Sequence, residues 1–202
     1  MEFRAILQRR KMVRIYGQRP VTPEVIDRIL SVVVHAPSAG YTQGNEFLVL
    51  DEPDAVGDFF RITDDPGDPM YADMGGVLPP VVVLPLANKR AYLDRYSEPD
   101  KAQWGLGDEA MWPVPYWDVD AGMASMLMLC AAIDEGLGAW FSGIFEHEAE
   151  MLAHFGVPER FRPIGFIGLG YAVPKDPVIS GTSSASKRAK RRADDLVHRN
   201  RW

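Results

Sequence analysis

The sequence has a single cysteine, Cys130, among its 202 residues, which excludes an intrachain disulfide. Because this cysteine lies in an apolar stretch, we expect a buried, unreactive thiol rather than a nucleophile. Long apolar runs are also missing, and those around residues 77–87 and 123–133 are too short to span a bilayer. The first residues contain no apolar core of a signal peptide. We therefore expect a cytoplasmic protein with no membrane partner.

The chain also has no excess of positive charge. The chain has 22 Lys and Arg against 28 Asp and Glu, a formal net charge of -6, and its aromatic residues are not interleaved with the basic ones. This balance argues against a nucleic-acid partner. The four histidines are scattered, and no Cys/His/Asp cluster has the spacing of metal ligands, so we expect no metal site.

The composition is that of an ordinary soluble protein, with 47% hydrophobic and 25% charged residues, and 202 residues fit a single domain. A strong helix start lies at Thr22, where a capping residue precedes Pro23 and Glu24. We predict helices over residues 2–10, 22–37, 118–136 (with Asp118 as its cap) and 146–155, strands over 46–50, 81–86, 139–142 and 164–173, and a basic amphipathic helix over 187–198. The helix over 118–136 is apolar almost all round, which indicates burial within the domain or at a subunit interface.

Residues 87–117 are rich in Tyr, Trp, Pro, Asp and Gly and show no clear period. Irregular segments of this length are usually functional or disordered, and the aromatic residues argue against disorder. We predict a mobile insertion that covers a substrate pocket, in which aromatic rings stack on a planar molecule. The alternative is that these rings only cover a hydrophobic cleft.

Cations gather at the two ends of this acidic chain. One cluster contains Arg10, Lys11 and Arg14, and the other contains Lys190, Arg191 and Arg192. If the clusters meet in space, they form a site for a phosphate group, which accepts charge-assisted hydrogen bonds from both kinds of cation. The alternative is two separate solvated surfaces.

A turn of small and polar residues joins the second predicted helix to the first strand. Its sequence is Ala-Pro-Ser-Ala-Gly-Tyr-Thr-Gln-Gly over residues 36–44. Such a turn exposes backbone N–H groups and lets a ligand approach closely.

The order of these features resembles the FMN-dependent nitroreductase family. The resemblance rests on the basic segment 10–14, the Pro-Val pair at 20–21, the Ala-Pro-Ser turn with Gln43, and the strand that follows. The start and end of the 118–136 helix, the Gly-Leu-Gly-Tyr at 168–171 and the basic tail also match. The resemblance therefore covers nearly the whole chain.

It implies an α+β fold, with a nitroreductase-like central mixed or antiparallel sheet flanked by helices, in an intertwined homodimer that holds FMN between its subunits. The residues implied to bind FMN are Arg10, Lys11, Met12, Arg14, Pro37, Ser38, Ala39, Tyr41, Gln43, Ser142, Gly143, Lys190, Arg191 and Arg192. Met12 stands where the family usually has Ser, so only its backbone can contribute. Ser142 and Gly143 would lie near flavin N5, and Arg191 and Arg192 in the 174–202 tail would close on the phosphate.

The implied activity is transfer of hydride from NADH or NADPH through flavin N5 to a planar acceptor, such as a nitroaromatic or a quinone, with ping-pong kinetics. The flavin carries this chemistry, so no catalytic acid or base is needed in the sequence, and none is evident. Two alternatives keep the fold. One is different flavin chemistry (deazaflavin-dependent reduction, flavin cleavage or dehalogenation), and the other is a non-catalytic flavin-binding protein.

Overall fold

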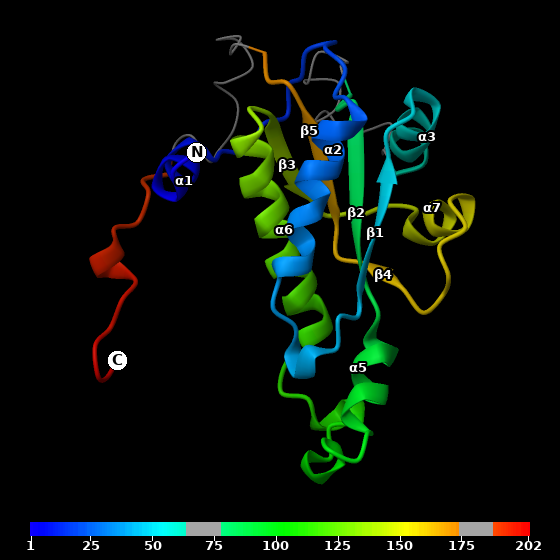
Figure 1. Ribbon diagram of the computed structural model, residues 1–202, viewed down its shortest axis with the longest axis vertical. Helices are drawn as coiled ribbons and strands as arrows, with labels where there is room; N and C mark the ends of the chain where they lie inside the picture. The colour runs from blue at the N-terminus through cyan, green and yellow to red at the C-terminus, as the bar shows by residue number, and fades with distance from the viewer. Residues whose placement is uncertain (64–77, 174–187) are drawn as a thin grey trace.

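A five-stranded sheet forms the centre of the computed structural model (Figure 1), which describes residues 1–63, 78–173 and 188–202. The strands are β1 (Asn45–Leu50), β2 (Val81–Ala87), β3 (Gly138–Ser142), β4 (Arg162–Pro163) and β5 (Phe166–Gly170). Their order is β1-β2-β5-β3, with β4 also paired to β2, and all these pairs are antiparallel. The predicted α+β class and the central sheet are confirmed. Residues 174–187 of the 174–202 tail lie outside the described residues.

Helices cover both faces of this sheet. Helices α2 (Pro23–Leu30) and α6 (Tyr116–Asp134) pack on one face, and α3 (Pro53–Thr63) and α7 (Glu148–His154) pack on the other (Figure 1). Strand β2 is buried along its whole length. Val81 and Val83 belong to the core under α2 and α6, and Val82, Leu84 and Leu86 belong to the core under α3 and α7. An unbroken apolar strand is typical of a sheet covered on both faces. Helix α3 was not predicted from the sequence.

Helix α6 begins two residues before the predicted start. Its N-cap is Pro115, which makes no side-chain capping bond, and Asp118 instead pairs with Arg162 beside β4. The helix buries Trp117, Ala121, Ala124 and Met128 against the sheet. Its opposite side leaves a stripe of apolar side chains exposed, formed by Tyr116, Val119, Met123 and Met126.

The irregular segment predicted over 87–117 is largely structured. It contains helix α5 (Lys89–Tyr96) and two short 3-10 turns, η3 (Ala102–Trp104) and η4 (Glu109–Met111). Tyr92 of α5 is fully buried, and the Trp112 ring contacts the rings of Tyr92 and Tyr96 at centroid distances of 6.2 and 4.8 Å. The expectation of a segment without regular structure is therefore wrong for α5, because these aromatic residues form a local core, whereas its mobility stays a prediction.

The ends of the chain differ from each other. Helix α1 (Phe3–Arg9) packs on the C-terminal half of α6, where the N-terminal amine pairs with Asp134. The helix predicted over 187–198 is wrong for the described part, in which every residue from 188 to 202 is exposed and the only helical element is the 3-10 turn η7 (Ala193–Asp195). In Figure 1 this tail extends away from the sheet and its covering helices.

The N-terminal basic segment is attached to the edge of the sheet. The Val13 N–H donates to the Ala139 carbonyl oxygen at 2.9 Å, and Met12 forms a parallel bridge with Ala139 of β3. The buried Tyr16 hydroxyl lies 2.5 Å from the carbonyl oxygen of Val13 and 3.0 Å from that of Gly168. It can donate its proton to either oxygen. Residues 12–17 are therefore tied to the sheet at two places, to Ala139 of β3 and, through the Tyr16–Ala172 bridge, to the segment after β5, which fixes the position of Arg14.

Replacement of Tyr16 by Phe removes this buried donor. We expect the Tyr16→Phe variant to lose about 1–2 kcal/mol of unfolding free energy, because two buried carbonyl groups lose their shared partner. Urea denaturation measures the change, and Tyr41→Phe, whose side chain is exposed, serves as the control. Equal stability of the two variants would show that the Tyr16 hydroxyl does not anchor the segment.

Candidate functional site

The predicted site residues fall into three groups in the structure. The first group is the basic segment beside strand β3, with Arg10, Lys11, Met12 and Arg14. Ser142 is the last residue of the same strand, and Gly143 follows it. Ala139 and Ser142 are three residues apart, or about 10 Å along a strand. The basic segment and the Ser142–Gly143 step therefore share one edge of one protomer.

The cations of the basic segment are free of ion pairs. Among the described residues, none of Arg10, Lys11 and Arg14 forms a salt bridge, whereas Arg28, Arg61, Arg95 and Arg162 each pair with a carboxylate. The Arg14 guanidinium lies over the Trp140 ring, 5.3 Å from its centroid, which orients it without neutralising its charge. This donor set fits a phosphate group.

Arg10 lies close enough to Cys130 of α6 to influence its thiol. Burial raises the pKa of the Cys130 thiol, and the positive charge of Arg10 lowers it by a smaller amount. The thiol therefore stays protonated at neutral pH, as expected of an unreactive cysteine, although Cys130 is half-buried and not buried as predicted.

The backbone at Ser142 is tightly packed. Gly165 precedes β5 with φ +140, a region open to glycine, and a Cβ there would collide with the Ser142 carbonyl oxygen. At Gly143 the Phe145 ring occupies the space of a side chain, since an added Cβ would lie 2.7 Å from Phe145 Cζ. Phe145 is 83% exposed and was not singled out from the sequence, because an isolated Phe in a loop carries no pattern.

The second group is the 38–43 turn, which contains Ser38, Ala39, Tyr41 and Gln43 and follows Pro37. The Gln43 N–H donates to Ser38 Oγ at 2.9 Å, and Thr42 Oγ1 donates to the Ala39 carbonyl oxygen at 2.6 Å. Gly40, Tyr41 and Gln43 have positive φ values of 63°, 56° and 53°. The Tyr41 side chain is 78% exposed and points away from its own protomer's core. Non-glycine residues with positive φ values are strained and often mark functional turns.

Asp120 of α6 anchors this turn and was missed as a site residue. It is 1% exposed, and its Oδ2 accepts hydrogen bonds from the Ala39 N–H at 2.8 Å and the Tyr92 hydroxyl at 2.7 Å. A carboxylate inside an otherwise apolar helix was the signal in the sequence, since such groups are rarely buried without partners.

Helix α6 separates the first two groups. The turn is bonded to Asp120, near the start of the helix, and α1 with the N-terminal amine packs near its end, at Asp134 (Figure 1). Fourteen residues of α-helix span about 21 Å, which separates the turn from the N-terminal amine. Arg10 lies beside Cys130, ten residues or about 15 Å along the helix from Asp120. Among the described residues, no hydrogen bond or ion pair joins the basic segment to the 38–43 turn.

The third group, Lys190, Arg191 and Arg192, lies in the exposed tail. Arg191 donates to the Asp195 carbonyl oxygen, and Arg192 lies 3.6 Å from Asp194, so these polar contacts stay within the tail. The predicted meeting of the two basic ends is not seen within one protomer and stays a prediction for the assembly.

Within residues 1–63, 78–173 and 188–202, none of the helices is long and apolar enough to cross a membrane. Over the same ranges, no group of three or more His, Cys, Asp or Glu side chains has the arrangement of a metal site.

Comparison with known proteins identifies the class. The profile of the Nitroreductase family matches residues 7–74 and 78–171, so the chain belongs to that family. A protein from Archaeoglobus fulgidus, provisionally named an NADH dehydrogenase/NAD(P)H nitroreductase, is 26% identical over 196 residues, covering 96% of this chain and 94% of the relative. The family and this name support an oxidoreductase function in general.

Solved structures share the fold. A protein from Parabacteroides distasonis, described as an NADH dehydrogenase/NAD(P)H nitroreductase, superimposes with a TM-score of 0.70 at 20% identity, covering 100% of this chain and 99% of the other. An FMN-dependent nitroreductase from Clostridium difficile has a TM-score of 0.68 at 18% identity and covers 98% of each chain. The predicted family resemblance is confirmed.

The close approach of Gly165 to Ser142 generates a prediction. The Gly165→Ala variant should lose about 1–3 kcal/mol of unfolding free energy from its backbone conformation alone, with a further loss from the collision. Gly57→Ala in α3 is the matched control, because that position has open space and gains helix propensity. Denaturant midpoints measure both, and a Gly165→Ala variant as stable as wild type would contradict the packing described at Ser142.

Proposed function

We propose that this protein is an FMN-dependent oxidoreductase that takes hydride from NADH or NADPH and passes it to a planar acceptor, such as a nitroaromatic or a quinone. Family membership supports the general reaction. The observation that carries the proposal is a group of cations, Arg10, Lys11 and Arg14, which form no ion pair with the described part of the chain and lie on the same sheet edge as Ser142 and Gly143. An FMN phosphate carries about two negative charges at neutral pH, which these cations would neutralise.

The contribution of each residue follows from its position. Arg10 and Lys11 supply charge, and Arg14, held by Trp140, supplies an oriented guanidinium. Met12 stands where a hydroxyl donor is usual, and its backbone is engaged in the bridge to Ala139. Ser142 and Gly143 provide main-chain groups at the end of β3, beside the exposed Phe145 ring. Bound FMN would supply the hydride chemistry at N5, and the protein would orient it and exclude water.

The complete site is proposed to form between two copies of the chain. The 38–43 turn is bonded to Asp120, whereas Arg10 lies beside Cys130, about 15 Å further along α6, so the turn of one subunit would join the cations of the other. The stripe on α6 leaves Val119, Met123 and Met126 between 37% and 40% exposed, and Phe3 and Leu7 of the adjoining α1 are exposed too. A contiguous apolar surface of this kind is typical of a subunit interface.

The proposed role of the exposed tail is to reach the same phosphate in the dimer with Lys190, Arg191 and Arg192. The proposed role of the 87–117 segment is to face the acceptor with its solvent-accessible apolar residues, Trp104, Met111, Val114 and Tyr116. The inner aromatic residues of that segment pack on one another and hold it in place.

Flavin uptake tests the proposal directly. Flavin-free protein should bind FMN, and NADH or NADPH should bleach its absorbance under anaerobic conditions. The Arg14→Gln variant should bind FMN about 10–100-fold more weakly, because a hydrogen bond to a charged group contributes about 1.5–3 kcal/mol.

The control for this experiment is Arg61→Gln, which removes an arginine that is paired with Asp58 on α3 and should leave FMN affinity unchanged. A wild-type protein that takes up no FMN would refute the proposed function. FMN binding without reduction by either nicotinamide would favour a deazaflavin donor or a non-catalytic binding protein.

The proposed dimer generates a separate prediction. Met126→Asp places a charge in the α6 stripe and should shift the protein to monomers in sedimentation velocity, with loss of FMN uptake. Ala153→Asp, on the exposed side of α7, should remain dimeric. A wild-type monomer that binds FMN fully would contradict the shared site.

A further inference from the structure

The 38–43 turn is bound to helix α5 through a buried carboxylate. Asp120 Oδ2 accepts one hydrogen bond from the Ala39 N–H, at 2.8 Å, and one from the Tyr92 hydroxyl, at 2.7 Å. Burial raises the pKa of the Tyr92 hydroxyl, and the bond to Asp120 raises it further, so Tyr92 remains a donor throughout the physiological pH range. The single oxygen of Asp120 therefore joins the turn, α5 and α6.

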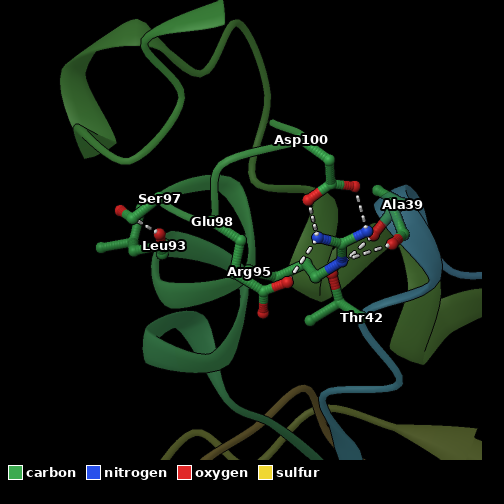
Figure 2. A network of polar contacts seen from close by, with 8 residues as sticks. Ala39, Thr42, Leu93, Arg95, Ser97, Glu98 and Asp100 are labelled. Carbon is green, nitrogen blue, oxygen red and sulfur yellow. Dashed lines mark hydrogen bonds and ion pairs between the residues drawn. The ribbon is translucent and has the colours of Figure 1, made fainter. Parts of the chain in front are cut away.

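Arg95 makes a second link between α5 and the turn. Its Nε donates to the Gly40 carbonyl oxygen at 3.1 Å. Its other two nitrogens donate one hydrogen bond to Glu98, at 2.7 Å, and two to Asp100, both at 2.8 Å. Figure 2 shows the guanidinium between these carboxylates and the turn that contains Ala39 and Thr42. The two acidic partners hold the planar guanidinium in one orientation, which aims Nε at the turn.

Two glycines let the tyrosines of α5 approach the turn. A Cβ on Gly40 would lie 2.7 Å from Tyr96 Cε2, and one on Gly44 would lie 2.6 Å from Tyr92 Cε2. The rings therefore pack directly on the backbone within the turn, at Gly40, and just after it, at Gly44. Because Tyr41 and Gln43 hold positive φ values, the turn needs such outside contacts to keep its conformation.

From these contacts we infer that Asp120 and Arg95 are positioning residues for the flavin site. They fix the 38–43 turn against α5 so that its exposed groups are preorganised for the ligand. This inference rests on the proposed function, because the turn is taken to contact FMN bound to the partner subunit. It also assigns α5 a role distinct from covering the acceptor.

Variants of Asp120 separate positioning from general stability. Asp120→Ala removes the acceptor, whereas Asp120→Asn keeps one carbonyl oxygen that can accept from Ala39. In flavin-free protein, hydrogen exchange of a peptide covering residues 37–44 should be about ten-fold faster in Asp120→Ala, and Asp120→Asn should restore most of the protection. The FMN dissociation constant should follow the same order, with about a ten-fold rise for Asp120→Ala.

Arg95→Met is a second variant. The Arg95 side chain is partly exposed, so its loss should leave the fold intact. It should raise the FMN dissociation constant and change the flavin absorbance band, while the unfolding midpoint stays near that of wild type. Arg61→Met, which removes a similar arginine paired with Asp58 on α3, is the matched control and should change none of these. If Asp120→Ala does not fold, Arg95→Met and Asp120→Asn decide the question.

The outcomes distinguish this inference from the proposed function. If wild type binds FMN, and Asp120→Ala and Arg95→Met bind it equally well with unchanged exchange over 37–44, the positioning role is overturned and the function stands. If wild type binds no FMN, the proposed function is wrong and so is a flavin-positioning role. Faster exchange in Asp120→Ala would then show only that the carboxylate fixes the turn.

Discussion

The rigid length of α6 is the constraint on which the candidate site depends. The helix bonds the 38–43 turn near its start, at Asp120, and carries α1 and the N-terminal amine near its end, at Asp134. A helix does not shorten, so the turn and the N-terminal amine stay about 21 Å apart in any conformation that keeps the fold, and Arg10, beside Cys130, lies about 15 Å along the helix from Asp120. In the proposed dimer, the turn of one copy would join the basic segment of the other. The exposed apolar stripe on α6 gives a physical reason for such copies to associate.

Much of the fold was predictable because apolar patterns decided it. Strand β2 is apolar at nearly every position, and a chain this size has few other ways to bury such a run. Helix α5 was not predicted, because Tyr92 is its one buried residue, half of the helix is charged, and Tyr92 packs on rings far along the sequence. The tail shows the opposite error. Its basic pattern suits a helix, but short helices form mainly where they can bury a face, and residues 188–202 bury none here.

The candidate site was predictable to a different degree. Family motifs gave the identity of the basic segment, the 38–43 turn and the Ser142–Gly143 step, although only an assembly can test whether they meet. The positive φ values of Tyr41 and Gln43 had no signal in the sequence, since neither residue is a usual left-handed former. The link from Asp120 to Ala39 and Tyr92 joins residues 81 and 28 positions away. Such bonds follow from packing and not from spacing.

The contacts of α5 bear on how acceptor choice would relate to flavin binding in the proposed enzyme. The rings of α5 hold the segment after it, which supplies the apolar surface proposed to face the acceptor, and α5 is also bonded to the turn proposed to contact FMN. The turn and the cations of a given site would come from different subunits. Substitutions in α5 would then alter the acceptor surface and the flavin contact of the same site together. The phosphate contacts, which belong to the other subunit's sheet edge, would remain as they were. Acceptor preference could therefore change without loss of the cofactor only where a substitution spares Asp120, Arg95 and the two tyrosine rings.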